Sequence, residues 1–216
     1  PKARSFSDHR FAELPSLLRP GDLVVVNDAA TLPASLRITN HDAELGLLAR
    51  DRDGTFRAVA FGAGDFRTTT EARPPPPRFA PQSELVFDGL RASVVDVDAE
   101  EPRLLRVRFD RDGRELFEAL YRAGRVVQYA YVDQPLELWD VQNRYASRPW
   151  AFELPSAGRP LTFGLIGELR ARGIALAVVT HPAGLSSTGS MSLDRRLPVP
   201  EQSDIPAETV RAVEAA

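Results

Sequence analysis

Apolar and polar positions follow one pattern at the two ends of this chain and another in its middle. A continuous apolar run over 23–26 lies between the turn residues 20–22 and the polar pair 27–28. Such a run predicts a strand that is covered on both faces. A second run over 174–180 follows a helical pattern over 162–172, with a glycine after the helix as its stop. Polar residues that directly follow strands of this kind lie where open α/β sheets bind ligands.

The middle of the chain alternates between apolar and polar residues over short segments. The segment 103–109 alternates almost strictly, as a half-buried strand does. Asp-Gly pairs separate several of these segments and predict tight turns. Short strands at this spacing are typical of an antiparallel barrel or sandwich. The expected strands are 35–39, 44–50, 55–61, 83–87, 90–97 and 103–109.

Helical patterns also occupy 11–18 and 112–124, and Pro206 opens a last helix. Residues 126–132 are expected to be extended, and the four prolines of 74–77 to form a surface loop. Helices and strands alternate at both ends around a strand-rich middle, which predicts an α/β fold with an inserted antiparallel β-barrel domain. The predicted domains are a discontinuous α/β domain of residues 1–32 and 125–216, and an inserted β-barrel-like domain of residues 33–124.

The composition excludes several kinds of functional site. The chain has no cysteine, which excludes disulfides, thiolate metal sites and a cysteine nucleophile. Its three histidines are far apart in the sequence, so no metal site is expected. No apolar run approaches the roughly 20 residues that cross a bilayer, and the first ten residues lack the apolar core of a signal peptide. We therefore expect a cytoplasmic protein without a membrane partner, and a monomer.

Two polar sites follow the predicted strands. His181 comes directly after the second strand, where it could move a proton near neutral pH; the alternative is a structural histidine that caps a turn. Asp28 could accept ribose hydroxyls or act as a base, and Asn27 could read the edge of a heterocycle. The alternative for this pair is an Asx-turn that leaves the strand.

Two further segments carry candidate binding residues. In 142–145, Tyr145 could stack on a base and Gln142 could pair with a base edge; the alternative is a polar loop with one packed aromatic. In 155–158, a turn that contains Gly158 precedes a helix and could offer N–H groups to an anion, while the alternative is helix capping alone.

Segments 14–36, 142–146, 155–158 and 173–181 together resemble the S-adenosylmethionine:tRNA ribosyltransferase-isomerases of queuosine biosynthesis. That family typically has PGDLLVxNDTRVIPARL, YQTVYA, PTAGLHF and a strand that ends in a Thr/Leu-His turn. The resemblance implies the same α/β plan with an inserted β domain. It also implies transfer and isomerisation of the ribosyl group of S-adenosylmethionine onto 7-aminomethyl-7-deazaguanine in tRNA, giving epoxyqueuosine, adenine and methionine.

The resemblance, taken with the positions of these residues, assigns roles. S-adenosylmethionine would be a substrate, tRNA a partner, and no metal would be needed. The catalytic residues would be His181 and Asp28. The substrate-binding residues would be Asn27, Gln142, Tyr145, Ser156, Gly158, Thr180 and Gly184.

The chain departs from the family pattern at several positions. The pair 29–30 is Ala-Ala where the family has Thr-Arg, and 159–163 lacks the histidine of Leu-His-Phe. The His-x-Met-His-x-Glu element corresponds to 194–202, where only Glu201 matches its glutamate, and a further Gly-Thr-Thr segment would lie beyond Ala216. The chain thus resembles a diverged and truncated member. One alternative is a relative that binds an adenosyl ligand or RNA without catalysis.

A third hypothesis is a nucleic-acid-binding β module. Small barrels bind RNA, and one strand with its following turn carries four arginines that could form a basic stripe. The alternative is a solvated strand face. The residues are Arg103, Arg106, Arg108 and Arg111.

Overall fold

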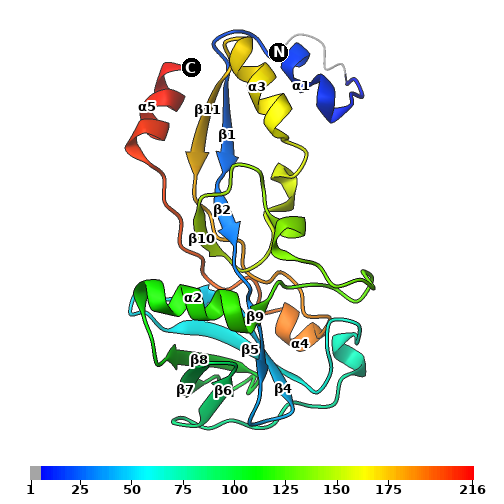
Figure 1. The fold of residues 1–216 in the computed structure, drawn as a ribbon, viewed down its shortest axis with the longest axis vertical. Helices are drawn as coiled ribbons and strands as arrows, with labels where there is room; N and C mark the ends of the chain where they lie inside the picture. Colours follow the sequence, from blue (N-terminus) through cyan, green and yellow to red (C-terminus); the bar gives the residue numbers. More distant parts are fainter. Residues whose placement is uncertain (1–5) are drawn as a thin grey trace.

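The fold is described from a computed structural model, which describes residues 6–216. The molecule is elongated, with a small parallel sheet at one end and a larger curled sheet at the other (Figure 1). The small sheet consists of β1 (Leu23–Asn27) and β11 (Ala175–Val179), the two apolar runs of the sequence. The helices α3 (Phe163–Ala171) and α5 (Ala207–Ala215) lie beside it.

The strands β1 and β11 pair in parallel, from Leu23 opposite Ala175 to Asn27 opposite Val179. The prediction of two strands here is confirmed, but the prediction that both faces are covered is not. The face that carries Val26 packs against α3, whereas Val25 on the opposite face is 44% exposed. Side chains alternate between the two faces of a strand, so α3 covers only every second residue, and α5, which also contacts both strands, leaves Val25 partly exposed.

A second parallel pair continues the chain from β1 toward the larger sheet. It joins β2 (Ala29–Thr31) to β10 (Arg148–Ala151), with a register shift between Arg148 and Ala151. The alanine pair 29–30 therefore lies in a strand, and Ala29 is fully buried. This pairing places residues 142–147, which precede β10, next to the end of β1.

The larger sheet is antiparallel and has the strand order β6-β7-β8-β5-β4-β3-β9. All six predicted strands of the middle region are present, and Gly89 takes a φ of +66° in the two-residue turn between β6 and β7. The strands are β3 (Ser35–Ile38), β4 (Ala43–Arg50), β5 (Phe56–Gly62), β6 (Glu84–Phe87), β7 (Leu90–Val97), β8 (Leu104–Phe109) and β9 (Gly124–Arg125).

This sheet curls without closing. Thr39, just after β3, donates from its backbone N–H to the oxygen of Val86 in β6 at 2.7 Å. No ladder joins β6 to β3 or β9 in residues 6–216, so the predicted antiparallel β-barrel is confirmed as a curled half-barrel, and closure of the sheet is not shown. The edge strand β9 has only two residues, which is too short to complete a ring.

The main core lies between this sheet and α2 (Gly113–Ala123). The helix buries Leu116, Ala119 and Leu120, three positions that recur along one face of a helix. On another part of the sheet, Leu48 and residues of β5 pack against the segment that follows β11, which includes α4 (Met191–Asp194). That segment therefore joins the two ends of the molecule.

The remaining elements are short. The predicted helix over 11–18 is a 3-10 turn followed by one turn of α-helix, and residues 126–132 contain no strand in the structure. These elements are η1 (Phe11–Glu13), α1 (Leu14–Leu17), η2 (Thr70–Ala72), η3 (Leu138–Val141) and η4 (Ser156–Gly158).

Some predictions are left open by the fold. The division into domains 1–32 with 125–216 and 33–124 stays a prediction. The prediction that the first ten residues lack a signal-peptide core falls partly on residues 1–5, outside those the structure describes. Within 6–216, no helix has the length and apolar character needed to cross a membrane.

Candidate active site

The parallel pairing of β1 and β11 brings the two predicted polar sites together. The Asn27 side chain donates from Nδ2 to the backbone oxygen of His181 at 2.7 Å, and the His181 backbone N–H donates to Asn27 Oδ1 at 2.9 Å. The Asn27 amide also accepts a bond from the backbone of Ala29 at 3.1 Å. Asn27 therefore fixes the backbone on which the histidine ring is mounted.

Asp28 directly follows Asn27 in the chain and is only 5% exposed. The hydroxyl of Thr180 donates to Asp28 Oδ1 at 2.6 Å, and the hydroxyl of Ser147 donates to Oδ2 at 2.5 Å. Both carboxylate oxygens therefore have a protein partner, as a buried carboxylate requires. A catalytic role for Asp28 stays a prediction, and it requires a substrate hydroxyl to replace one of these two.

The His181 ring is half exposed and faces a carboxylate. Its Nε2 lies 3.0 Å from Glu201 Oε2, and the other oxygen of Glu201 accepts the backbone N–H of Gly184 at 2.6 Å. A Cβ on Gly184 would lie 2.8 Å from both Glu201 Oε1 and the backbone oxygen of Leu48, so this position needs glycine. Glu201 thus orients the ring, as the partner of a proton-carrying histidine does.

Gln142 does not face an open site. Its side-chain amide accepts the backbone N–H of Thr31 at 3.0 Å and donates to the backbone oxygen of Thr31 at 2.9 Å. Both polar atoms of this amide therefore bind backbone. Base recognition by Gln142 stays a prediction and would need these bonds to break.

Tyr145, Ser156 and Gly158 form a second group near α3. A Cβ on Gly158 would lie 1.9 Å from the Tyr145 hydroxyl, so the two residues are in close contact. Burial raises the pKa of Tyr145, and the Ser156 side chain is exposed. Next to them, buried Asn143 donates to the oxygen of Pro155 at 2.9 Å, while its Oδ1 has no partner in the described part of the chain.

Three residues at this site were not predicted from the sequence: Ser147, Arg148 and Asp204. Thr180 and Asp204 exchange backbone hydrogen bonds, each of 2.9 Å, and the Asp204 carboxylate pairs with Arg148. Ser147 contacts Asp28, which links the 142–148 segment to the strand ends. No sequence spacing indicates these contacts, because the partners are separated by 24 to 119 residues. Within residues 6–216, no group of three or more His, Cys, Asp or Glu side chains could hold a metal ion.

The segment after Gly184 is held by a second hydrogen-bonded group. The Tyr129 hydroxyl donates to one oxygen of Glu153, and both the backbone N–H and the hydroxyl of Ser186 donate to the other at 3.1 Å. Burial, together with the Glu153 carboxylate, raises the pKa of Tyr129 well above its usual range. The folded protein therefore favours the protonated phenol.

This contact predicts a pH-dependent stability. The unfolded tyrosine titrates near pH 10, so the contribution of Tyr129 should be complete below about pH 10 and decline as the pH rises above it. Urea unfolding at pH 8 to 11 should show a weaker alkaline loss of stability for Tyr129→Phe than for the wild-type protein. Tyr131→Phe, the matched control, should keep the wild-type dependence. Equal loss in all three proteins would contradict the prediction.

Comparisons with known proteins identify the family of this chain. The family model described as "Queuosine biosynthesis protein" matches residues 1–216, and the chain belongs to that family. The resemblance that the motifs predicted is thereby confirmed.

Similar relatives carry one name, S-adenosylmethionine:tRNA ribosyltransferase-isomerase. The protein of Anaeromyxobacter dehalogenans is 36% identical over 192 residues, which are 85% of this chain and 52% of the relative. That of Acidiphilium cryptum is 32% identical over 82% of this chain and 50% of its own length. The chain thus spans about half the length of these relatives.

A solved structure was also matched. It is the S-adenosylmethionine tRNA ribosyltransferase from Thermotoga maritima, with 20% identity and a TM-score of 0.29 over 94% of this chain and 50% of that one.

Proposed function

We propose that this chain acts in the transfer and isomerisation of the ribosyl group of S-adenosylmethionine onto 7-aminomethyl-7-deazaguanine in tRNA, which gives epoxyqueuosine. The observation that carries the proposal is the His181–Glu201 pair at the end of β11, in a family whose similar relatives bear that enzyme's name. S-adenosylmethionine and tRNA would be the substrates, with adenine and methionine as the other products. A cytoplasmic monomer without a metal belongs to the same proposal.

The roles follow from the chemistry. The reaction needs a base near the ribose 5′-carbon, recognition of hydroxyls and a group that protonates the departing adenine. His181 can carry protons near neutral pH and is half exposed to a substrate. Asp28 and Thr180 lie beside it and could recognise a ribose hydroxyl, whereas Asn27 and Gly184 hold the loop in place.

The remaining predicted binding residues lie on the neighbouring segment. Tyr145, Ser156 and Gly158 would contact the RNA or the donor, since Tyr145 is half-buried and Ser156 is exposed near the start of α3. Gln142 would support them through its bonds to the Thr31 backbone.

The experiment uses the protein expressed from its complete gene. It is mixed with S-adenosylmethionine and tRNA that carries 7-aminomethyl-7-deazaguanine, and adenine is followed by liquid chromatography–mass spectrometry. Adenine release matched by a modified nucleoside in the tRNA is the expected result. No adenine, beside an active relative assayed in parallel, would reject the proposed reaction.

Binding without turnover is the second candidate function. It is favoured by the Gln142 amide, which is bound to backbone, and by Asp28, whose oxygens both have protein partners. Binding of S-adenosylmethionine with no adenine release would support this alternative.

RNA binding through the arginine stripe has less support. Arg106 and Arg108 both lie within 4 Å of Asp53, at 3.9 and 3.6 Å. Arg103 donates to the oxygen of Ala60, and burial lowers its pKa. Three of the four guanidinium groups therefore already have a protein partner, and the single Asp53 carboxylate reduces the attraction of two of them for phosphates.

A further inference from the structure

A small cavity lies beside the candidate active site. It is bounded by the end of β4, by α2 and β10, and by Pro182, Glu201 and Gln202 from the two segments that carry the His181–Glu201 pair. Its volume is about 90 Å³, roughly that of three water molecules in the liquid. Pockets for whole small-molecule ligands have roughly 300–1,000 Å³, so this cavity admits one polar group and not a nucleoside.

One wall of this cavity carries an exposed arginine on an aromatic platform. Arg50 is the last residue of β4, and its guanidinium carbon lies 5.7 Å from the centroid of the Phe56 ring and 5.8 Å from that of Phe117. Both distances fall within the roughly 6 Å range of a cation–π contact. Phe56 is fully buried and meets the rings of Phe109 and Phe152 edge to face, so the platform that holds Arg50 is fixed.

The guanidinium group of Arg50 has no hydrogen-bond or ion-pair partner among residues 6–216. The backbone oxygen of Arg50 accepts a hydrogen bond from Gln202 Nε2 at 3.2 Å, which ties the end of β4 to the segment that carries Glu201. Within the described part of the chain, Glu201 is the only acidic residue that lines the cavity, and it already binds the His181 ring and the Gly184 N–H. The cavity therefore presents a fixed cation whose N–H groups are free.

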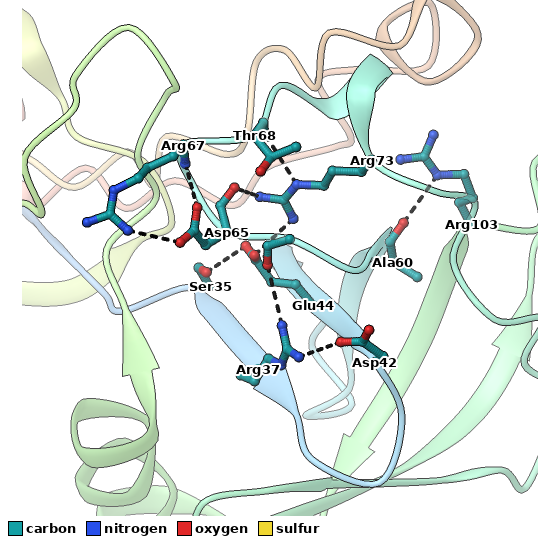
Figure 2. Close-up of polar contacts among 11 residues, drawn as sticks. Ser35, Arg37, Asp42, Glu44, Ala60, Asp65, Arg67, Thr68, Arg73 and Arg103 are labelled. Carbon is teal, nitrogen blue, oxygen red and sulfur yellow. Dashed lines mark hydrogen bonds and ion pairs between the residues drawn. The ribbon is translucent and has the colours of Figure 1, made fainter.

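Other arginines of the curled sheet and its loops differ from Arg50 in this respect. Figure 2 shows four guanidinium groups that each bind a protein oxygen: Arg37 with Asp42, Arg67 with Asp65, Arg73 with Glu44, and Arg103 with the backbone oxygen of Ala60. These side chains hold strands and loops together. Arg50 is instead held by rings, which leave its hydrogen-bonding capacity unused.

This arrangement fits a phosphate group. The guanidinium presents its N–H groups as a planar fork that matches two oxygens of a phosphate, and stacking on aromatic rings holds that fork in place. Proteins that bind single-stranded RNA commonly combine arginine with aromatic side chains. Because Arg50 is exposed, an RNA strand that runs over the surface can place one phosphate on it without entering the cavity as a whole.

We propose that Arg50 binds a phosphodiester group of an RNA strand, and that this contact positions the strand beside the His181–Glu201 pair. The identification of the RNA as the substrate tRNA rests on the proposed function. The contact is separate from the arginine stripe of β8, because Arg106 and Arg108 lie near Asp53 whereas Arg50 has no carboxylate partner in residues 6–216. Arg50 holds the RNA and takes no part in the proton transfers.

The test is equilibrium binding of the unmodified tRNA transcript at several salt concentrations, on the protein expressed from its complete gene. Arg50→Gln should weaken binding about tenfold, because a charge-assisted contact is lost. It should also reduce the slope of the logarithm of affinity against the logarithm of salt concentration by about one unit, the share of one phosphate. Arg50→Lys keeps the charge but not the fork, so it should keep the wild-type slope and lose less affinity.

The matched control is Arg52→Gln, which removes an exposed arginine two residues away, in the turn between β4 and β5 and outside the cavity. It should leave both the affinity and the slope unchanged. Equal losses in the Arg50 and Arg52 variants, wild-type binding by Arg50→Gln, or no tRNA binding by the wild-type protein would each overturn the proposal. Calorimetry with S-adenosylmethionine should give the same affinity for Arg50→Gln as for the wild-type protein; a loss there with tRNA binding intact would assign Arg50 to a ligand carboxylate instead.

The proposed function and this inference can fail separately, because the binding test needs no turnover. An Arg50-dependent affinity for tRNA without adenine release would reject the proposed reaction alone. Adenine release with the same KM for tRNA in Arg50→Gln as in the wild-type protein would reject this contact alone. If both hold, Arg50→Gln should raise the KM for tRNA and leave kcat at saturating tRNA unchanged, since the contact is made before and during the reaction alike.

Discussion

Replacing His181 by alanine is expected to lower the rate of adenine release by about 10²–10⁴-fold, the usual contribution of a general acid or base. The ring is the only imidazole at the ends of β1 and β11 among residues 6–216, and it is half exposed beside the Glu201 carboxylate. The measurement is single-turnover adenine release at saturating S-adenosylmethionine and substrate tRNA. Full turnover in His181→Ala would show that the proton carrier lies elsewhere.

A second variant separates catalysis from folding. Glu201→Gln keeps an oxygen that can accept the Gly184 N–H but removes the charge that faces the ring. It should lower the rate less than His181→Ala, because the imidazole is kept and only the contact that orients it is weakened. His9→Ala, which removes an exposed histidine near the N-terminus, should leave the rate unchanged.

Strands and turns could be predicted from the sequence where apolar runs, alternation or turn residues determine them. The two apolar runs became the paired strands β1 and β11, and the Asp-Gly turn at 88–89 joins β6 to β7. Turn residues and alternation act over a few residues, so they can be recognised in one sequence. Closure of a sheet depends on all its strands at once, and the open edge at β9 could not be predicted this way.

Only the part of the candidate site that lies at the strand ends could be predicted from local pattern. Asn27, Asp28, Thr180 and His181 meet because the ends of parallel strands lie at one edge of a sheet. Gln142 and Asp28 instead bond to protein groups more than 110 residues away, which spacing does not reveal. The Arg106 and Arg108 side chains likewise meet Asp53 across the sheet, so one carboxylate offsets part of the positive charge of the apparent basic stripe.

The Glu44–Arg73 pair shows how strongly such a long-range contact can matter. Glu44→Ala is expected to lower the free energy of unfolding by about 3–5 kcal/mol, because it leaves the Arg73 charge buried without a counter-charge. Urea unfolding at neutral pH measures the loss. Glu84→Ala, the matched control, removes a carboxylate that pairs with Arg91 at 2.8 Å on the exposed face, and should cost about 0–1 kcal/mol.

The same variants test how the 65–73 loop is held against the sheet. Arg73 holds the 65–73 loop through the Thr68 and Asp65 oxygens, and this loop carries Glu71. A similar small cost for Glu44→Ala and Glu84→Ala would mean that water reaches the pair and that the loop is held by other contacts.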